Sequence, residues 1–288
     1  MNLKSAVVAA LAVATAALSA CGAPEKPVRV TPAAAAVTSG PVQVPTPEWV
    51  DVDGQGSYSP FGYTPAPGVR ILHTGTDGAL KMCSLGPAVR REGGYGSGFL
   101  TAGHCLNSNA PTTMRLATDS SGGSTALAVA DRATGSQSWV EKTAMDGASI
   151  WGPVASPRIA GWPVAGALTV VGVRELVKVG DPICFVGATT QRVTCGPAVS
   201  VSGSQILFRR SSSEHNGGDS GGPVFLVDSG GRAHLIGIYS GNDSADESRA
   251  VATFLDPQLG HLRAEVMTDR IAAQSVRGDK RWSTAAAS

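Results

Sequence analysis

The sequence predicts an all-β protein built from many short strands. Glycine and proline are frequent, with 36 and 18 copies in 288 residues, and both favour turns over long regular elements. Short apolar runs separated by turn residues recur along the chain, while helical periodicity is sparse. Since 42% of the residues are hydrophobic and 16% are charged, the chain can bury the core of one large domain or two small ones. Antiparallel barrels or sandwiches are typical of this pattern.

The strands are expected, in chain order, at 69–72, 98–101, 126–130, 167–173, 183–186, 205–209, 224–227, 233–239 and 250–255. The pattern changes after Pro257. There Leu259, Leu262 and Val266 recur at helical spacing, and 264–273 is rich in helix formers. We therefore expect a folded domain over 68–276 that ends in a helix, followed by a polar tail over 277–288.

The first 20 residues have the features of an export signal. Lys4 provides a short positive region, and 6–18 is an apolar run that is too short to span a bilayer permanently. The signal ends in Leu-Ser-Ala-Cys, which resembles the bacterial motif for lipid attachment to a cysteine, here Cys21. The alternative is simple secretory cleavage near Ala17 or Ala20. The expected location is therefore the outer face of the cell membrane, or, without the lipid, a soluble secreted state.

A tether is expected over 21–67, because this segment is rich in proline, alanine and threonine and offers few residues for a core. Trp49, Phe61 and Tyr63 lie toward its end and are candidates for docking on the domain.

The five cysteines are an odd number for an exported protein. If Cys21 carries lipid, four remain, and four cysteines allow three pairings. We favour a bond between Cys83 and Cys105, which would clamp the segment carrying His104, and a bond between Cys184 and Cys195, which would close a hairpin. Such bonds indicate an oxidising compartment.

Two segments carry the chemistry of a nucleophilic site. Residues 217–224 read Gly-Gly-Asp-Ser-Gly-Gly-Pro-Val and place Ser220 among glycines, which allow the backbone to approach a substrate closely. Residues 101–105 read Thr-Ala-Gly-His-Cys and place His104 just after an apolar run. A serine hydroxyl is a weak nucleophile at neutral pH and needs a base, and the base needs an orienting acid.

These two motifs resemble those of the trypsin/chymotrypsin-family serine proteases. The segment 184–196 is similar to a disulfide-closed hairpin of the bacterial streptogrisin and α-lytic protease relatives, and 237–241 to the strand that lines their substrate cleft. The resemblance covers roughly residues 69–260. It implies two six-stranded antiparallel barrels with the active site between them.

The resemblance also implies a chain order of His, Asp and Ser, which guides the choice of the acid. Asp146 is preferred because the small residues after it open into apolar sequence, as in the family. Asp131 is the second choice. The remaining aspartates between the base and the nucleophile are Asp119, Asp181 and Asp219.

By the same resemblance, Ser220 is the nucleophile, His104 the base, and the N–H groups of Gly218 and Ser220 the oxyanion hole. Ser240 and Gly241 would pair with the substrate backbone. Glu214 would form the base of the pocket for the residue before the cleaved bond and favour Lys or Arg there, or it is a loop residue facing solvent.

The resemblance also implies that Asp219 is buried and needs a cationic or amine partner, yet the position of the relatives' arginine holds Phe185 or Ala188 here. Arg192, Arg209 and Arg210 are the candidate substitutes.

The expected function is a serine endopeptidase that acts on proteins or peptides. The alternatives are an inactive relative that serves as a binding module, and an esterase with the same triad. A net charge of +1 gives no electrostatic basis for nucleic-acid binding. The five histidines do not form metal-ligand spacings, so no cofactor is expected. A monomer is expected.

Overall fold

The computed structural model describes residues 44–75, 78–106, 112–133, 145–210 and 217–283. All of these belong to one compact unit that spans Gly40–Ser288. The expected signal peptide, Cys21 and Glu214 lie outside the described residues. Within the described ranges, no helix is both long enough and apolar enough to cross a membrane.

The second half of the chain forms a closed antiparallel barrel, here called barrel 2. Its strands follow the order β13-β10-β11-β12-β15-β14, and β13 also pairs with β14, which closes the ring. The strands are β10 (Pro182–Val186), β11 (Val193–Ser202), β12 (Gln205–Arg209), β13 (Pro223–Asp228), β14 (Ala233–Asp243) and β15 (Asp246–Phe254).

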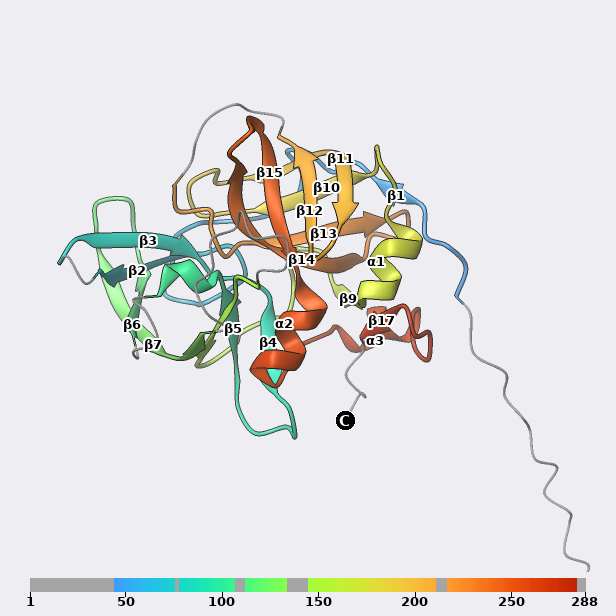
Figure 1. Cartoon of the computed structure of the whole chain (residues 1–288). Coiled ribbons are helices and arrows are strands. Elements are labelled where there is room, and N and C mark those ends of the chain that lie inside the picture. Colours follow the sequence, from blue (N-terminus) through green and yellow to red (C-terminus); the bar gives the residue numbers. More distant parts are fainter. Residues whose placement is uncertain (1–43, 76–77, 107–111, 134–144, 211–216, 284–288) are drawn as a thin grey trace, which may run out of the picture. The chain divides into compact units, whose positions relative to one another are not determined.

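The first half forms barrel 1, which lies beside barrel 2 (Figure 1). Its strands are β2 (Arg70–Thr74), β3 (Leu80–Ser84), β4 (Ala88–Arg91), β5 (Ser97–Thr101), β6 (Thr112–Ala117), β7 (Ser124–Ala133) and β8 (Ala148–Trp151), in the order β4-β5-β8-β7-β6-β2-β3. The chain runs almost directly from β3 into β4. There the Gly86 N–H donates to the Leu100 carbonyl and the Leu100 N–H to the Pro87 carbonyl, so this segment pairs with β2 at one end and β5 at the other. It therefore closes a second six-stranded barrel, and the predicted double-barrel fold is confirmed.

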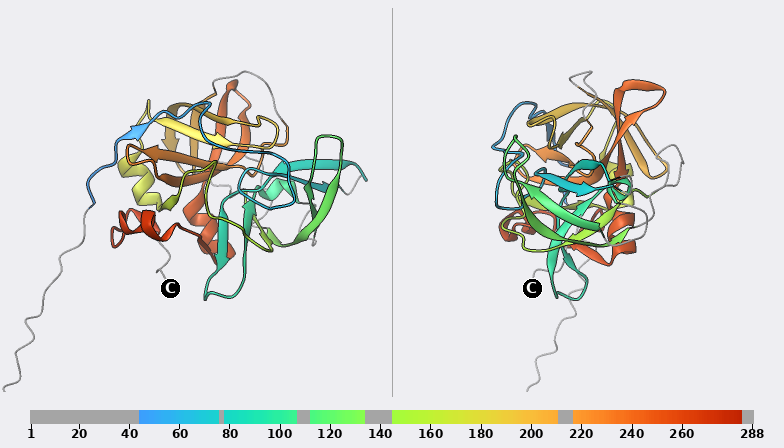
Figure 2. Two further views of the ribbon diagram at one scale, coloured as in Figure 1. Left: turned by 180° about the vertical axis from the view of Figure 1, so that it is seen from behind. Right: turned by 90° about the vertical axis from the view of Figure 1, so that its left-hand side faces the viewer.

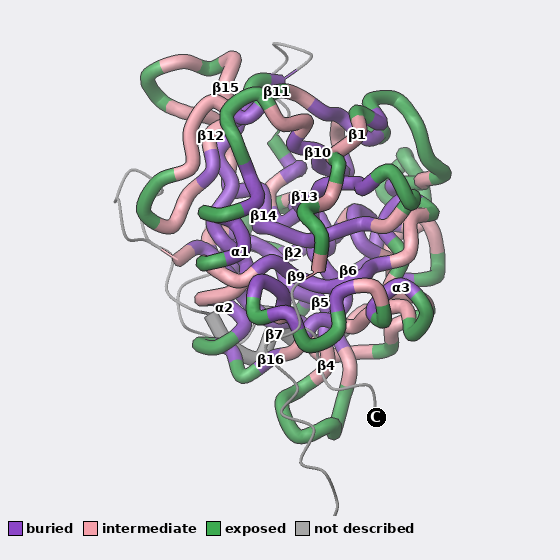
Figure 3. Tube along the Cα trace, turned by 90° about the vertical axis from the view of Figure 1, so that its right-hand side faces the viewer, coloured by how far each residue is buried: buried purple, intermediate pink, exposed green. Residues whose placement is uncertain are grey.

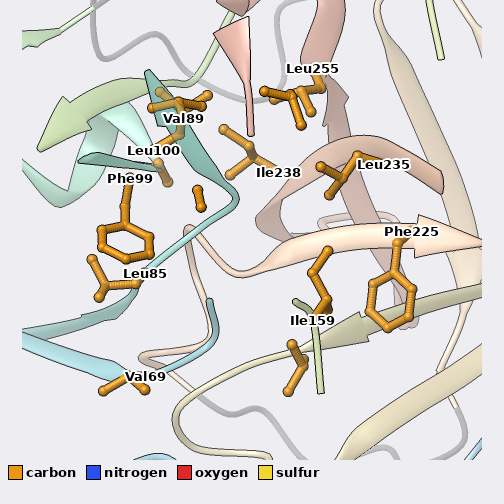
Figure 4. Packing of buried hydrophobic residues seen from close by; sticks show 14 of the residues in the cluster. Val69, Leu85, Val89, Phe99, Leu100, Ile159, Phe225, Leu235, Ile238 and Leu255 are labelled. Atoms are coloured by element: carbon orange, nitrogen blue, oxygen red, sulfur yellow. The ribbon is translucent and has the colours of Figure 1, made fainter. Parts of the chain in front are cut away.

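Two apolar cores hold the barrels. One fills barrel 2 and includes Phe185, Phe208 and Ile236. The other joins the two barrels, bringing residues such as Phe99 and Leu100 together with Phe225 (Figure 4). The six residues of β13 are all buried, and the four from Val224 to Val227 alternate between the two cores. This explains why the sequence of the strand is an apolar run. Figure 3 shows that burial follows the strands and that exposure is concentrated in the turns.

The expected strand at 167–173 is wrong in its second half. The strand β9 (Val164–Leu168) ends at Leu168, and helix α1 (Val170–Leu176) follows. The Thr169 hydroxyl accepts a hydrogen bond from the Gly172 N–H at 3.0 Å. This N-cap satisfies one of the free N–H groups of the first turn and lets the apolar run continue as a helix.

The expected continuous helix after Pro257 is also wrong. Helix α2 (Leu255–Leu262) ends because Arg263 adopts a left-handed conformation, with φ of 50°. Strand β16 (Ala264–Val266) then pairs with β4, and helix α3 (Arg270–Gln274) begins after its cap, Asp269. The expected polar tail is wrong for residues 277–283. Trp282 is buried, and β17 (Trp282–Ser283) pairs with β9.

The expected tether also differs in the part that the structure describes, from Val44 onward. Strand β1 (Trp49–Val50) pairs with β13, and the Trp49 indole N–H donates to the Leu176 carbonyl at 3.1 Å. Figure 2 shows this blue segment running along barrel 2. Phe61 packs under the Arg70 guanidinium at 4.6 Å, whereas Tyr63 is 80% exposed. Residues 44–67 therefore belong to the folded domain, while 21–43 lie outside the described residues.

Candidate active site

His104 and Asp146 come from the ends of two neighbouring strands of barrel 1. His104 lies in a short 3₁₀ turn after β5, and Asp146 precedes β8, which pairs with β5. The Asp146 carboxylate accepts from the His104 main-chain N–H at 2.9 Å and lies 2.7 Å from the ring Nδ1. Because an ionised carboxylate only accepts, Nδ1 carries the proton of the neutral ring and Nε2 keeps its lone pair. Asp146, fully buried, is therefore the acid that orients this imidazole.

Ser220 lies on a loop that is bonded to both barrels. The Ser84 N–H of barrel 1 donates to the Ser220 carbonyl at 2.8 Å, and the Gly221 N–H donates to the Tyr239 carbonyl of barrel 2 at 2.8 Å. These bonds fix the serine at the junction of the two barrels. Ser220, His104 and Gly218 line one cavity of about 410 Å³. No hydrogen bond joins the Ser220 hydroxyl to His104 in this structure; such bonds are often long until a substrate is bound.

The peptide between Gly217 and Gly218 is held in one orientation. The Thr189 hydroxyl donates to the Gly217 carbonyl at 2.8 Å, and in a trans peptide the adjoining N–H points the opposite way. Gly218 has φ of +107°, and a Cβ there would lie 2.6 Å from the Thr189 hydroxyl, so glycine is required. Among the described residues, the N–H groups of Gly218 and Ser220 meet no protein acceptor. Both donors are therefore available to an anion.

Asp219 is fully buried and is held by neutral groups. Its carboxylate accepts from the main-chain N–H groups of Thr189 and Thr190, at 2.7 and 2.9 Å, and from the Thr190 hydroxyl. Burial raises the pKa of Asp219, and the threonine hydrogen bonds oppose that shift. Of the candidate cations, Arg210 opposes the same rise of the pKa through its charge, whereas no ion pair joins Arg192 or Arg209 to Asp219 among the described residues. The arginine near Asp219 is therefore Arg210, which acts as a nearby charge. The sequence signal that could have found the partners is the Thr-Thr pair at the hairpin turn.

Arg210 also forms a hydrogen bond within barrel 2. It is 8% exposed, and its guanidinium donates to the Asn242 side-chain oxygen at 2.9 Å. The Tyr239 hydroxyl donates to the same oxygen at 2.7 Å, and its ring stacks on Phe185 at 4.7 Å. Burial raises the pKa of Tyr239 to about 12. A buried cation thus lies beside the strand that carries Ser240.

Ser240 and Gly241 lie on β14 next to the loop that carries Ser220. The strand is irregular here, because its pairing with β15 shifts between Tyr239 and Gly241. The Ser240 side chain is turned inward, 3.3 Å from the Thr253 hydroxyl. A Cβ on Gly241 would meet nothing within 4 Å, so the space on the side-chain side of this residue is open. Glu214 lies outside the described residues, so its side chain is not placed in this site.

Disulfides join Cys83 to Cys105 and Cys184 to Cys195. The first anchors the turn that carries His104 to β3. The second joins β10 and β11 on either side of the turn that carries Thr189 and Thr190. Cys83, Cys105 and His104 lie close together, but the two sulfurs bond to each other and are not thiolates that could bind a metal.

The chain is similar to several solved bacterial proteases. It is 21% identical to "a glutamic acid specific serine protease" that "utilizes a novel histidine triad in substrate binding", with 70% of this chain and 99% of that chain covered and a TM-score of 0.48. A Cellulomonas bogoriensis chymotrypsin is 20% identical, with 72% and 100% covered and a TM-score of 0.44. Thermobifida fusca protease A is 22% identical, with 74% of this chain and 100% of that chain covered and a TM-score of 0.42. No protein-family model and no curated protein matches the sequence. The likeness concerns the fold alone, and the strand pairing described above establishes that fold independently.

Proposed function

We propose that the protein is a serine endopeptidase that uses His104, Asp146 and Ser220. The observation that carries the proposal is the oriented pair formed by His104 and Asp146, which shares a cavity with Ser220. The two available N–H groups of Gly218 and Ser220 support it. Nucleophile, base, orienting acid and anion donors are the parts that acyl transfer requires.

In the proposed reaction, the Ser220 oxygen bonds to the scissile carbonyl carbon while its proton passes to His104 Nε2. The Asp146 carboxylate holds the ring and stabilises the resulting cation. The oxyanion accepts hydrogen bonds from Gly218 and Ser220, and each such donor is worth about 2.7–4 kcal/mol in related sites. His104 then gives its proton to the leaving nitrogen as the C–N bond breaks. Water, activated by His104, hydrolyses the acyl-enzyme.

Ser240 and Gly241 are proposed to bind the acyl side of the substrate. The backbone at Ser240 and Gly241 would pair with an extended peptide as an added strand, and the open space beside Gly241 leaves room for it. This mode of binding suits a polypeptide substrate better than a small ester, because main-chain hydrogen bonds repeat along the chain.

The test is cleavage of a peptide library by the purified protein, with product ends identified by mass spectrometry. We expect internal cleavage that Ser220→Ala and His104→Ala both abolish, while Ser229→Ala, in an exposed turn, leaves it intact. Hydrolysis of esters without any peptide cleavage would favour the esterase. Peptide binding without hydrolysis of either substrate would favour the inactive binding module.

For the location, we propose export and attachment by lipid at Cys21. The support is the lipid-attachment motif at the end of the signal sequence, together with two disulfides, which suit an oxidising compartment. Radiolabelled palmitate should be incorporated into the wild-type protein and not into Cys21→Ser. Equal release of both forms into the medium would instead indicate simple secretion.

A further inference from the structure

We propose that the cavity beside Ser220 is a subsite for a carboxylate on the leaving-group side of the scissile bond, one or two residues after it. The proposal rests on the proposed endopeptidase function, which it deepens. It concerns side chains that the catalytic mechanism does not use, His73 and Lys81.

The position of the cavity decides which part of the substrate it receives. Its described lining comes from β2, β3, the turn of His104 and the Ser220 loop, and β14 contributes none of it. Since His104 protonates the leaving nitrogen, the chain that follows the scissile bond must leave past His104. The cavity therefore takes residues on that side, while β14 takes those on the acyl side.

His73 is an unsatisfied polar group in the wall of this cavity. Its side chain lies on β2, it is 1% exposed, and neither ring nitrogen has a hydrogen-bond partner in the part of the chain that the structure describes. Burial lowers the pKa of His73, a main-chain contact with Thr74 opposes that shift, and the charge of Lys81 adds to it. The ring is therefore neutral at pH 7, with one N–H donor. Both ring nitrogens are buried, so the ring has to turn toward the cavity before a ligand can accept from it. A buried donor without a partner costs free energy, and such a contact removes that cost.

Lys81 gives the cavity its charge. It is directly opposite His73 in the pairing of β2 and β3, and its side chain is exposed. It makes no ion pair among the described residues, and the described cavity lining contains no acidic side chain. Met82 and Leu80 add apolar surface. A carboxylate on an aliphatic stem fits this combination, because the stem contacts the apolar wall and the oxygens meet a cation and an N–H.

Two sources of that carboxylate are possible, a glutamate side chain and the C-terminus of a short leaving peptide. They are separated with internally quenched peptides that share one acyl half. In the first set, the two positions after the scissile bond carry Glu, Gln or Leu within a longer amidated chain. In the second set, a two-residue leaving group ends in a free carboxylate or in an amide. We expect kcat/KM to be about tenfold higher for the carboxylate than for its neutral counterpart in at least one set.

The variants show whether the cavity causes that preference. Lys81→Met should bring the Glu/Gln or acid/amide ratio close to one, as should His73→Leu if it folds. Lys178→Met, a second exposed lysine away from the cavity, should keep the ratio. A wild-type ratio near one in both sets, or a ratio unchanged by Lys81→Met, would overturn the proposal.

Binding separates this proposal from the proposed function. Ser220→Ala protein is titrated with fluorescent peptides that have the leaving-group sequence, in Glu and Gln forms and as free acid and amide. If no peptide is cleaved but the carboxylate forms still bind about tenfold more tightly and Lys81→Met removes the difference, the catalytic assignment fails and the subsite stands. If peptides are cleaved but all forms bind equally, the subsite fails alone.

Discussion

The two barrels each bring one fully buried aspartate to the site, and they hold it in different ways. In barrel 1, Asp146 contacts the imidazole of His104, a group that can change its charge. In barrel 2, Asp219 is held by two main-chain N–H groups and a hydroxyl, none of which titrates near neutral pH. The comparison teaches that burial alone does not assign a role. In the proposed mechanism Asp146 is coupled to the transferred proton, whereas the hydrogen bonds of Asp219 join the loop that carries Ser220 to the hairpin turn of barrel 2.

Asp146→Asn should give the largest effect. The amide presents an N–H donor where the carboxylate accepted, so His104 would have to turn or change tautomer. We expect kcat to fall by about 10⁴, as for this change in enzymes with the same triad. The measurement is steady-state hydrolysis of a peptide identified in the library.

Asp181→Asn is the matched control, because Asp181 is another aspartate between His104 and Ser220 in the sequence. Among the described residues, its carboxylate accepts from the Lys178 main-chain N–H alone. A loss smaller than tenfold in Asp146→Asn would mean that Asp146 does not orient the base.

Thr190→Val should have a smaller effect, through geometry. It removes the hydroxyl donor from Asp219 while keeping the shape of the side chain, so a buried carboxylate loses one of three partners. We expect a loss of about 1–3 kcal/mol in the free energy of unfolding. We also expect kcat to fall about 10- to 100-fold, with little change in KM, because the oxyanion donors follow the loop.

Thr190→Ser is the rescue variant, since it restores the hydroxyl, and it should recover most of the lost kcat. If Thr190→Val and Thr190→Ser have the same kcat, the hydroxyl does not position the loop.

The pH dependence of stability should distinguish Asp219 from Asp228, the partner of His234 and Arg232. The pKa of Asp219 is raised by burial, so its contribution is fullest below its unfolded value near 3.8 and is lost as pH rises through the higher folded value. Burial opposes ionisation of Asp228, but the hydrogen bonds from His234 and Arg232 outweigh it and lower the pKa of Asp228 to about 2. Its contribution of about 1–2 kcal/mol is present above pH 3.8 and lost as pH falls toward 2.

Urea unfolding of Asp219→Asn and Asp228→Asn between pH 2 and 8 measures this. With rising pH, the wild type should lose stability relative to Asp219→Asn and gain stability relative to Asp228→Asn. If the stability difference from the wild type changes with pH in the same direction for both variants, the two aspartates do not differ as described.

Much of the fold was predictable because its signals are local. The strand at 205–209 has the predicted bounds, and the apolar run near 224–227 is a strand that packs on two cores. The helix α1 was missed because its cap, Thr169, decides between helix and strand for an apolar run that suits both. The strand β16 was missed because its pairing partner, β4, lies far away in the sequence.

In the site, too, the residues in local motifs were predictable and those that depend on distant contacts were not. His104 and Ser220 lie in recognisable motifs, and the contact between His104 and Asp146 joins the preferred acid to the base. Charge did not reveal the hydrogen-bond partners of Asp219, because two of them are main-chain N–H groups; the third, the Thr190 hydroxyl, is marked in the sequence only by the Thr-Thr pair. The isolation of His73 depends on what surrounds it in three dimensions, so only the structure could reveal it.

The most direct test of the central claim is active-site labelling by a fluorophosphonate, followed by peptide mapping. The account predicts a single adduct on Ser220 in the wild-type protein and loss of rapid labelling in His104→Ala. Thr190→Val should label more slowly than Thr190→Ser. A folded wild-type protein that takes up no label, or labelling of Ser220 at the same rate without His104, would contradict the assignment of this site.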